Sequence, residues 1–378
     1  MMFHEGPELS TVLQNVIPHP LAEELQDDEC QSRISSALAD QSGYSDLWEI
    51  TDRILESLVS SSGNDAFEVI KAFRETLSRE GAVALMTDVK TIGKDLAKMG
   101  LFQQYLTDTV LKPSHEAPRA VKPGPPNPSS PENYPAAIAR IQQQETLKQE
   151  CLRRDSYRCA YCHHIDFRCA KARLVVPGSS LVGVAELCHL LPAALAHFPT
   201  NSSRDKQALE DIWFALWRYF PGLKGKVGPD EDSLEQHANL VTFAISTRYF
   251  FDDHDIAFNP LEDTGAPNRY KIEKMLSGAF GDVPPEGHRE VMTLVSSLSD
   301  DDENPQLPLP EPELFRTHYQ IAKILKVTGV GREIDEVMSA SDWSFEDRPD
   351  YGLWLIGLNR VLANVVPHPL YPDAMAEF

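Results

Sequence analysis

Two proline-rich stretches divide this chain of 378 residues and limit where a packed core can form. The first, "KPSHEAPRAVKPGPPNPSSPENY" at 112–134, contains too few apolar residues to fold, and we expect a linker there. The second, at 281–312, combines an acidic run with alternating prolines, which predicts an extended, solvated connector. The sequence therefore predicts three folded parts, at 1–111, 135–280 and 313–378.

The first and last parts have the apolar spacing of amphipathic helices. In "YSDLWEITDRILESLVSS" apolar residues recur every three or four positions with acidic residues between them. "NDAFEVIKAFRETLSREG" behaves likewise, with Asn64 as its expected N-cap and Gly81 as its expected end. Further helices are expected in "THYQIAKILKVTG" and "DYGLWLIGLNRVLANVV". We expect an all-helical N-terminal region and a mostly helical C-terminal region.

The middle part combines helix-like and strand-like sequence patterns, which predicts an α+β fold for the chain. After a helix through "AAIARIQQQETLKQECLRRD", the runs "ARLVVP" and "LVGVAEL" are rich in β-branched residues and flank Gly178-Ser179-Ser180, a pattern of strand, turn and strand. His189 and "LLP" follow the second run directly. A helix is expected in "DKQALEDIWFALWRYF" and another from Asn239 to Asp252, before a strand at "IAF".

The net charge of −22 argues against a general affinity for nucleic-acid backbones. The charge is unevenly distributed, because residues 136–275 contain 17 Lys and Arg against 18 Asp and Glu. Any nucleic-acid chemistry is therefore expected in this middle segment. With no apolar run long enough for a membrane and no basic-then-apolar leader, we expect an intracellular protein of the nucleus or cytoplasm.

Short motifs of the middle part occur in a recognisable order. They are "ELCHLLP", a tryptophan-containing helix at 213–220, "NLV" from Asn239, and Phe251-Asp252 followed by "IAFNPL" and "PNRYKI". In this order and spacing, residues 157–272 resemble the HNH endonuclease family, and more closely its fungal HNH-domain proteins. The resemblance implies a small ββα-metal domain within the helical flanks.

The same resemblance implies a metal-dependent nuclease, a hydrolase of phosphodiester bonds in nucleic acid, with DNA favoured over RNA. His189 would be the general base and Asn239 would fix the loop that carries it. A divalent cation, Mg²⁺ or a transition metal, would be held by residues of the following helix. Imidazole titrates near neutrality, and a hard cation stabilises the charge on phosphate, so the chemistry suits these residue types.

Two residues depart from the family pattern. Arg248 stands where the pattern has histidine, and a guanidinium offers no lone pair to a metal. Cys188 stands where metal-binding members have aspartate, and a thiolate is a poor ligand for Mg²⁺. Asp252, one helical turn beyond Arg248, is the best candidate metal ligand that is left and Cys188 the weaker one, while Arg248 could contact a phosphate.

These departures support an alternative function, a catalytically degenerate HNH-fold module that binds protein or nucleic acid. In that case the acidic helical flanks would recruit protein partners. Each residue also has a structural interpretation: His189 as a histidine at a strand end, Asn239 as a helix N-cap, Arg248 as a solvated helix residue.

Two other features leave alternatives open. Five of the six cysteines lie between 151 and 188; among them Cys159, Cys162 and Cys169 would be zinc ligands or buried thiols. "NVIPHPL" at 15–21 recurs as "NVVPHPL" at 364–370. Seven residues are too few for a structural repeat, so the echo is a coincidence, two similar chain bends fixed by proline, or two equivalent docking segments.

Overall fold

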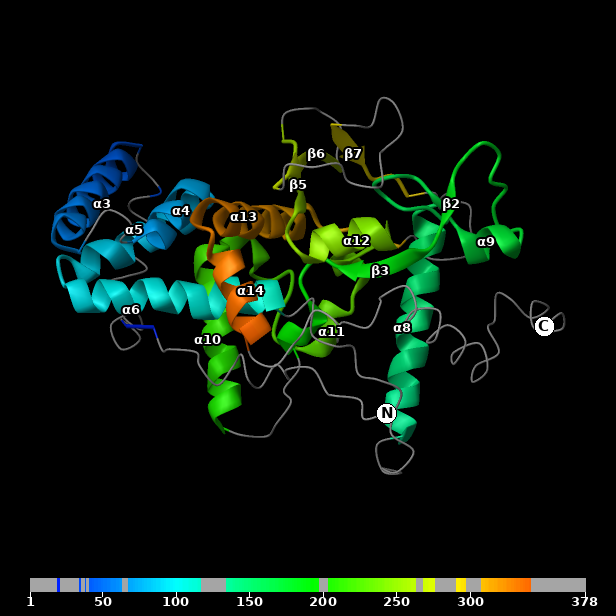
Figure 1. The fold of residues 1–378 in the computed structure, drawn as a ribbon, viewed down its shortest axis with the longest axis horizontal. Coiled ribbons are helices and arrows are strands. Elements are labelled where there is room, and N and C mark those ends of the chain that lie inside the picture. Colours follow the sequence, from blue (N-terminus) through cyan, green and yellow to red (C-terminus); the bar gives the residue numbers. More distant parts are fainter. Residues whose placement is uncertain are drawn as a thin grey trace.

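The computed structural model describes residues 19–20, 34, 38, 41–62, 67–116, 134–196, 203–262, 268–275, 290–296 and 307–340. Helices and small β-sheets together make up the fold, in agreement with the α+β prediction (Figure 1). The N-terminal helices lie at one end of the molecule, and the strands lie toward the other (Figure 1).

Every regular element in the described part of the N-terminal region is a helix, as predicted. Its elements are α3 (Gln41–Ser62), α4 (Glu68–Thr76), α5 (Arg79–Ile92), α6 (Leu96–Leu106), η2 (Thr107–Leu111) and α7 (Lys112–Glu116). The prediction that Gly81 ends a helix is wrong. α4 ends at Thr76, and the Ser78 hydroxyl accepts the Gly81 N–H at 3.3 Å to cap α5.

α6, η2 and α7 form one continuous helix with a π-helical turn in its middle. η2 is that turn, and the Lys112 N–H donates to the Thr107 carbonyl five residues earlier. Contrary to the predicted linker at 112–134, Ser114 and His115 are buried in α7. The apolar residues around the π turn pack in the core, which explains why the helix continues past the expected boundary. Residues 117–133 lie outside the described residues.

α8 (Tyr134–Arg154) ends in a buried ion pair. The Arg154 guanidinium donates to both carboxylate oxygens of Asp155, at 2.7 and 3.0 Å, and to the carbonyls of His237, Leu240 and Pro308. Asp155 in turn accepts the Thr242 hydroxyl proton at 2.6 Å. This one side chain therefore ties the end of α8 to the chain at 237–240 and at Pro308.

The region after α8 contains less strand than predicted. β1 (Ile165–Asp166) pairs in parallel with β2 (Val182–Gly183), and α9 (Phe167–Lys171) follows β1. The predicted strand "ARLVVP" at 172–177 is wrong, because these residues form turns and bends. Asp166 accepts the N–H groups of Arg168, Cys169 and Ala185, each at 3.0 Å, so its side chain starts α9 and ties it to the next strand.

Two antiparallel sheets follow. β3 (Ala185–His189) pairs with β4 (Leu240–Ala244), and α12 (Ile245–Asp252) continues directly from β4. The predicted helix from Asn239 is therefore strand in its first part. The second sheet has the order β5 (Ile256–Pro260), β6 (Arg269–Lys274), β7 (Val291–Thr293). β7 falls in the predicted connector at 281–312, which is thus structured at that point.

The connection between β3 and β4 is long and mostly helical. It contains η4 (Ala193–Ala196), α10 (Ser203–Tyr219), η5 (Pro221–Leu223), α11 (Glu231–Leu234) and η6 (His237–Asn239). α13 (Pro312–Thr328) confirms the C-terminal helix expected in "THYQIAKILKVTG", and Gly329 ends it in the left-handed region at φ 72°. α14 (Val330–Ala340) follows, and the helix expected at 350–366 lies outside the described residues.

The predicted parts share one hydrophobic core. A single cluster of buried residues extends from α3 to α14. Phe258 of β5 lies at its centre, with ring centroids 5.4 Å from Phe243, 6.0 Å from Phe251 and 5.9 Å from Phe315. These rings join β4, α12, β5 and α13, so the middle and C-terminal elements form one packed body.

Candidate functional site

β3, β4 and α12 form the unit that holds the predicted site residues. In the antiparallel pair, His189 at the end of β3 lies opposite Leu240 at the start of β4. α12 packs against both strands. Asn239 directly precedes β4, so it lies beside the residues that follow His189.

Asn239 fixes the chain immediately after β3. Its Oδ1 accepts the Leu191 N–H at 2.8 Å, while its Nδ2 donates to the carbonyls of Leu191 at 2.8 Å and Leu234 at 2.9 Å. Its own carbonyl accepts the Leu190 N–H. Asn239 is fully buried, and its amide is bonded to the strand end rather than to a helix N-terminus. The N-cap interpretation is therefore wrong, and the predicted contact between Asn239 and the His189 loop is present.

His189 is mostly buried and faces a carboxylate. Its Nε2 lies 3.3 Å from Oε1 of Glu235, and the two side chains are 15% and 6% exposed. Glu235 follows α11 and was not among the predicted site residues. Since it lies 46 positions from His189 along the chain, no local spacing points to this contact.

Arg248, Asp252 and Cys188 lie together on the α12 side of β3. Nε of Arg248 donates to Oδ2 of Asp252 at 3.1 Å, and the two side chains are 11% and 16% exposed. The Cys188 thiol is 3.5 Å from Oδ1 of the same carboxylate. One predicted metal ligand thus accepts hydrogen bonds from the other and from the arginine, and its negative charge is neutralised within the protein.

The donor set does not fit the divalent cation that the resemblance implies. A guanidinium carries no lone pair for a metal, and it occupies one side of the Asp252 carboxylate. Cys188 is a soft ligand on the other side. Within the part of the chain that the structure describes, no group of three or more His, Cys, Asp and Glu side chains is placed to hold a metal ion.

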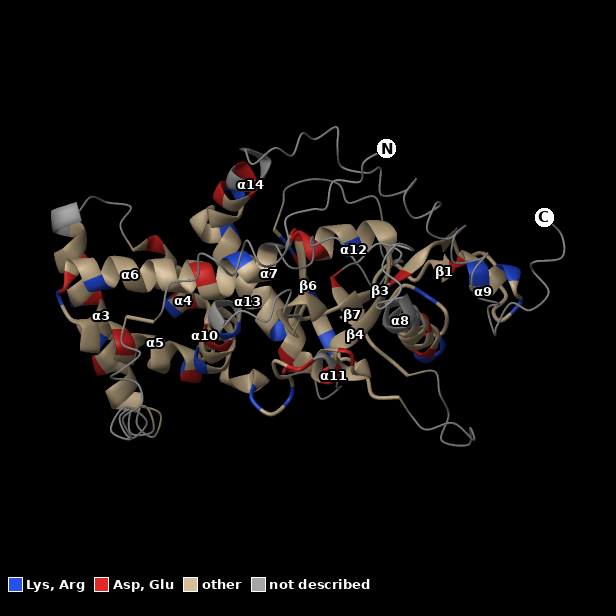
Figure 2. Cartoon of the chain, turned by 90° about the horizontal axis from the view of Figure 1, so that it is seen from below, with Lys and Arg blue, Asp and Glu red and all other residues tan. Residues whose placement is uncertain are grey.

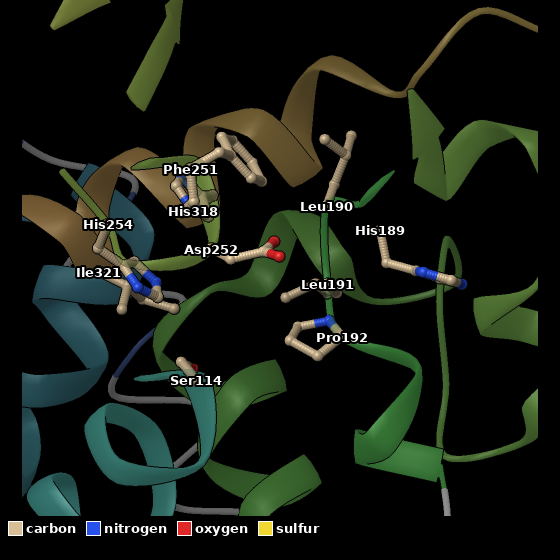
Figure 3. Close-up of a pocket in the computed structure, with 10 residues that line it drawn as sticks. All are labelled: Ser114, His189, Leu190, Leu191, Pro192, Phe251, Asp252, His254, His318 and Ile321. Atoms are coloured by element: carbon tan, nitrogen blue, oxygen red, sulfur yellow. The ribbon is translucent and has the colours of Figure 1, made fainter. Parts of the chain in front are cut away.

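The candidate base and the candidate ligands point in different directions. Successive side chains on a strand alternate between its two faces, so Cys188 and His189 face opposite ways. In Figure 3 the Asp252 carboxylate is directed toward the strand end, while the imidazole of His189 points away from it. The sequence-predicted residues therefore come together in the fold, but His189 is not aimed at Asp252.

Three buried histidines lie on the other side of Asp252. The ring of His318 stacks on Phe251 at 3.7 Å and on His254 at 4.6 Å, and the His254 ring lies 5.8 Å from that of His115. Burial lowers the pKa of His318 to about 3, although its Nε2 is 3.0 Å from the Phe251 carbonyl. His318 is therefore neutral and donates its Nε2–H to that carbonyl.

The space between these groups is small. It is lined by Ser114, His189, Leu190, Leu191, Pro192, Phe251, Asp252, His254, His318 and Ile321 (Figure 3). Its free volume of about 10 Å³ suits a single water molecule. A nucleotide cannot enter without movement of the surrounding side chains.

The cysteines do not assemble as the zinc interpretation requires. Sγ of Cys159 accepts the Cys162 N–H at 3.4 Å, so these two thiols share one turn. Cys169 lies on α9 in a separate cluster with Leu152 and Ala185. Burial raises the pKa of Cys159, but hydrogen bonds from Cys162 and from the backbone of Ala244 and Tyr161 outweigh it, and the net shift is downward.

A second surface feature is the arm formed by residues 165–183, which contains β1, α9 and β2. It carries Arg168, Lys171 and Arg173, and its one acidic residue, Asp166, is buried against backbone N–H groups. Figure 2 shows these basic positions on and beside α9, at one end of the molecule. The arm also exposes apolar side chains: Phe167, Leu174, Val176, Leu181 and Val182. A basic and partly apolar arm contrasts with the acidic charge of the whole chain.

No family model, curated protein or solved structure matches this chain. Among the described helices, none combines the length and the apolar character needed to cross a membrane.

Proposed function

We propose that this chain carries an HNH-type ββα module that binds nucleic acid, DNA in the first place, without cleaving it. The ion pair between Arg248 and Asp252 is the observation that carries the proposal. It places a protein cation beside the carboxylate that would otherwise hold the metal. Because Arg248 is permanently charged, its guanidinium stays beside Asp252 in place of a metal ion across the physiological pH range.

The order of β3, β4 and α12 supports the HNH-type assignment. His189 ends the first strand, Asn239 precedes the second and holds the chain after the first, and the helix follows without a break. These positions agree with the order expected from the sequence motifs. The assignment rests on this agreement of motif and geometry.

The arm at 165–183 is the surface on which we expect nucleic acid to bind. Its basic residues lie in the near-neutral middle part, and Phe167 is 53% exposed, which leaves an aromatic ring for stacking. Backbone contacts of this kind give salt-dependent binding, with a Kd on the order of 10 µM for non-specific duplexes.

Binding can be tested with a labelled DNA duplex in fluorescence anisotropy at several salt concentrations. The triple variant Arg168→Ala, Lys171→Ala, Arg173→Ala should bind more weakly, and its log–log salt slope should fall by roughly 2 to 3. A matched control removes the same charge from exposed positions on α5, on α6 and in the turn between them, through Lys90→Ala, Lys94→Ala and Lys98→Ala. Equal affinities for both triple variants would contradict the assignment of the arm.

An active nuclease is the second candidate, since His189 is held beside a carboxylate and next to the Asn239 contact. Plasmid cleavage with Mg²⁺, Mn²⁺, Ni²⁺ and Zn²⁺ decides between the two. We expect the wild type and His189→Ala to be equally inert. Cleavage by the wild type that His189→Ala abolishes would establish the nuclease and refute the non-cleaving module.

Arg248→His tests the ion pair itself. The substitution removes the guanidinium and adds an imidazole next to Asp252, so we expect Mn²⁺ or Ni²⁺ binding to appear in calorimetry. Arg248→Lys keeps the charge and serves as the control that stays unable to bind these metals. Metal binding by the wild type at the same strength would contradict the interpretation of Arg248.

A further inference from the structure

His19 is enclosed by an aromatic cage formed by the N-terminal helices and α10. In the sequence it is far from the strand pair β3 and β4. The His19 ring meets three rings edge-on: Tyr105 at 4.6 Å, Phe102 at 5.4 Å and Phe214 at 6.1 Å. Only 4% of His19 is exposed. The three rings belong to α6 and α10, and those of Phe102 and Tyr105 are part of the main hydrophobic core.

A buried polar group forms the floor of the cage. The Tyr219 hydroxyl donates its proton to Oδ2 of Asp88 at 2.9 Å, so it accepts the hydrogen bond that joins it to Nε2 of His19 at 3.0 Å. Arg218 donates to both carboxylate oxygens of Asp88, which is fully buried. Burial raises the pKa of Asp88, but Arg218 and the imidazole of His19, whose Nε2 lies 3.6 Å from Oδ2, outweigh it and lower this pKa overall. The cage therefore holds a ring that donates an N–H, which imidazole supplies.

His19 belongs to the motif that occurs twice in the chain. Residues 15–21 read "NVIPHPL" and residues 364–370 read "NVVPHPL", so the two copies differ only at Ile17 and Val366. In both, the histidine lies between two prolines, which restrict the backbone on each side of it. The second copy can thus offer the same side chain under the same backbone restriction. Apart from His19 and Pro20, both copies lie outside the described residues.

We propose that the cage is a recognition site for the Pro-His-Pro segment and that the C-terminal copy, through His368, exchanges with the N-terminal copy for it. Ala340 and His368 are 28 positions apart, a reach of about 90 Å for extended chain. A globular chain of this length has a radius of gyration of about 21 Å, so the copy can reach the cage of its own molecule. Because both copies are tethered, they compete at high effective concentration.

The test is a double-mutant cycle in the full chain, with His19→Ala, His368→Ala and both together. If the copies replace each other, each single variant keeps one occupant and the double variant keeps none. We expect the melting temperature of the double variant to fall by about 2–4 °C more than the two single losses combined. His4→Ala replaces His368→Ala in a control cycle, which should be additive. Additivity of the His19 and His368 losses overturns the proposal.

A second measurement leaves both histidines in place. Photo-reactive benzoylphenylalanine at Phe214, which is 40% exposed at the cage, should crosslink to peptides from both 15–21 and 364–370. The same group at Tyr249, 47% exposed on α12, is the control and should capture neither. Crosslinks to 15–21 alone would overturn the proposal. Crosslinks to 364–370 only within dimers would overturn the exchange within one molecule and identify a second copy as the source.

Discussion

Asn239 satisfies three backbone groups, two just after β3 and one at the end of α11. Its amide bonds to the N–H and carbonyl of Leu191 and to the carbonyl of Leu234 in a site closed to water. Polar groups left unbonded in such a site are costly, because they lose water without gaining a partner. The stability of the β3 end therefore depends on this one side chain.

Asn239→Ala should lower the free energy of unfolding by about 3 kcal/mol, since it orphans three buried groups. Urea denaturation followed by circular dichroism measures the change. Asn259→Ala removes a half-buried asparagine from β5 and should cost under about 1 kcal/mol. Equal losses in the two variants would contradict the importance of the Asn239 bonds.

The contacts of individual residues could be predicted where the two partners are close in the sequence as well as in space. Arg248 and Asp252 are one helical turn apart, and their shared face followed from the sequence. The His189 contact with Glu235 could not be predicted, because the connection between β3 and β4 determines it. The split of Cys169 from Cys159 likewise depends on where α9 packs.

At the scale of elements, helices α5 and α10 approach each other at Gly81. A Cβ added there would lie 2.1 Å from the backbone carbonyl of Tyr219, which cannot move without shifting α10. Tyr219 also forms part of the floor of the His19 cage. The absence of a side chain at position 81 therefore allows the contact that builds the cage.

Gly81→Ala should destabilise the protein by roughly 2–4 kcal/mol, although alanine favours helices. Gly100→Ala, on α6 with no atom within 4 Å of the added Cβ, should instead stabilise it by about 0.5–1 kcal/mol. Urea unfolding of the two variants gives both values. Stabilisation by both substitutions would show that α5 and α10 are not in close contact at Gly81.

Helices were predicted best where the regular spacing of apolar residues continued over many residues. α3, α8, α10 and α13 were expected from their spacing. Errors occurred in short segments: Leu240–Ala244 continues the apolar pattern of α12 but pairs with β3, and "ARLVVP" has strand composition without forming a strand. Whether such a segment becomes strand depends on pairing with a partner that is distant in the sequence. A local sequence pattern carries no information about that partner.

At the scale of the whole molecule, the three buried histidines join elements from the predicted linker at 112–134, the middle part and the C-terminal part. His115 comes from α7, His254 follows α12 and His318 belongs to α13. The unfolded chain exposes His318 to water, where its pKa is about 6.5. The folded chain holds it neutral down to about pH 3. Below pH 6.5 the unfolded state therefore binds a proton that the folded state does not.

Stability from this group is complete above pH 6.5 and is lost as the pH falls toward 3. The loss should approach about 1.4 kcal/mol per pH unit between pH 6 and 4. His318→Phe keeps a flat ring between Phe251 and His254 but cannot bind a proton. The free energy of unfolding of this variant should therefore change less with pH than that of the wild type, by about the slope given above. Unfolding by urea at each pH gives the difference, with His237→Phe as the control. Parallel curves for wild type and His318→Phe would contradict the shift.

The π turn at 107–111 adds a structural consequence of its own. A π turn holds one more residue than the α-helical turn it replaces, so the helix after it is rotated by about 100° relative to an uninterrupted α-helix. That rotation sets the direction in which α7 presents Ser114 to the small cavity and His115 to His254. The length of this stretch is therefore as constrained as its composition: removing a single residue would keep the helix and its apolar content, yet direct α7 at the wrong neighbours.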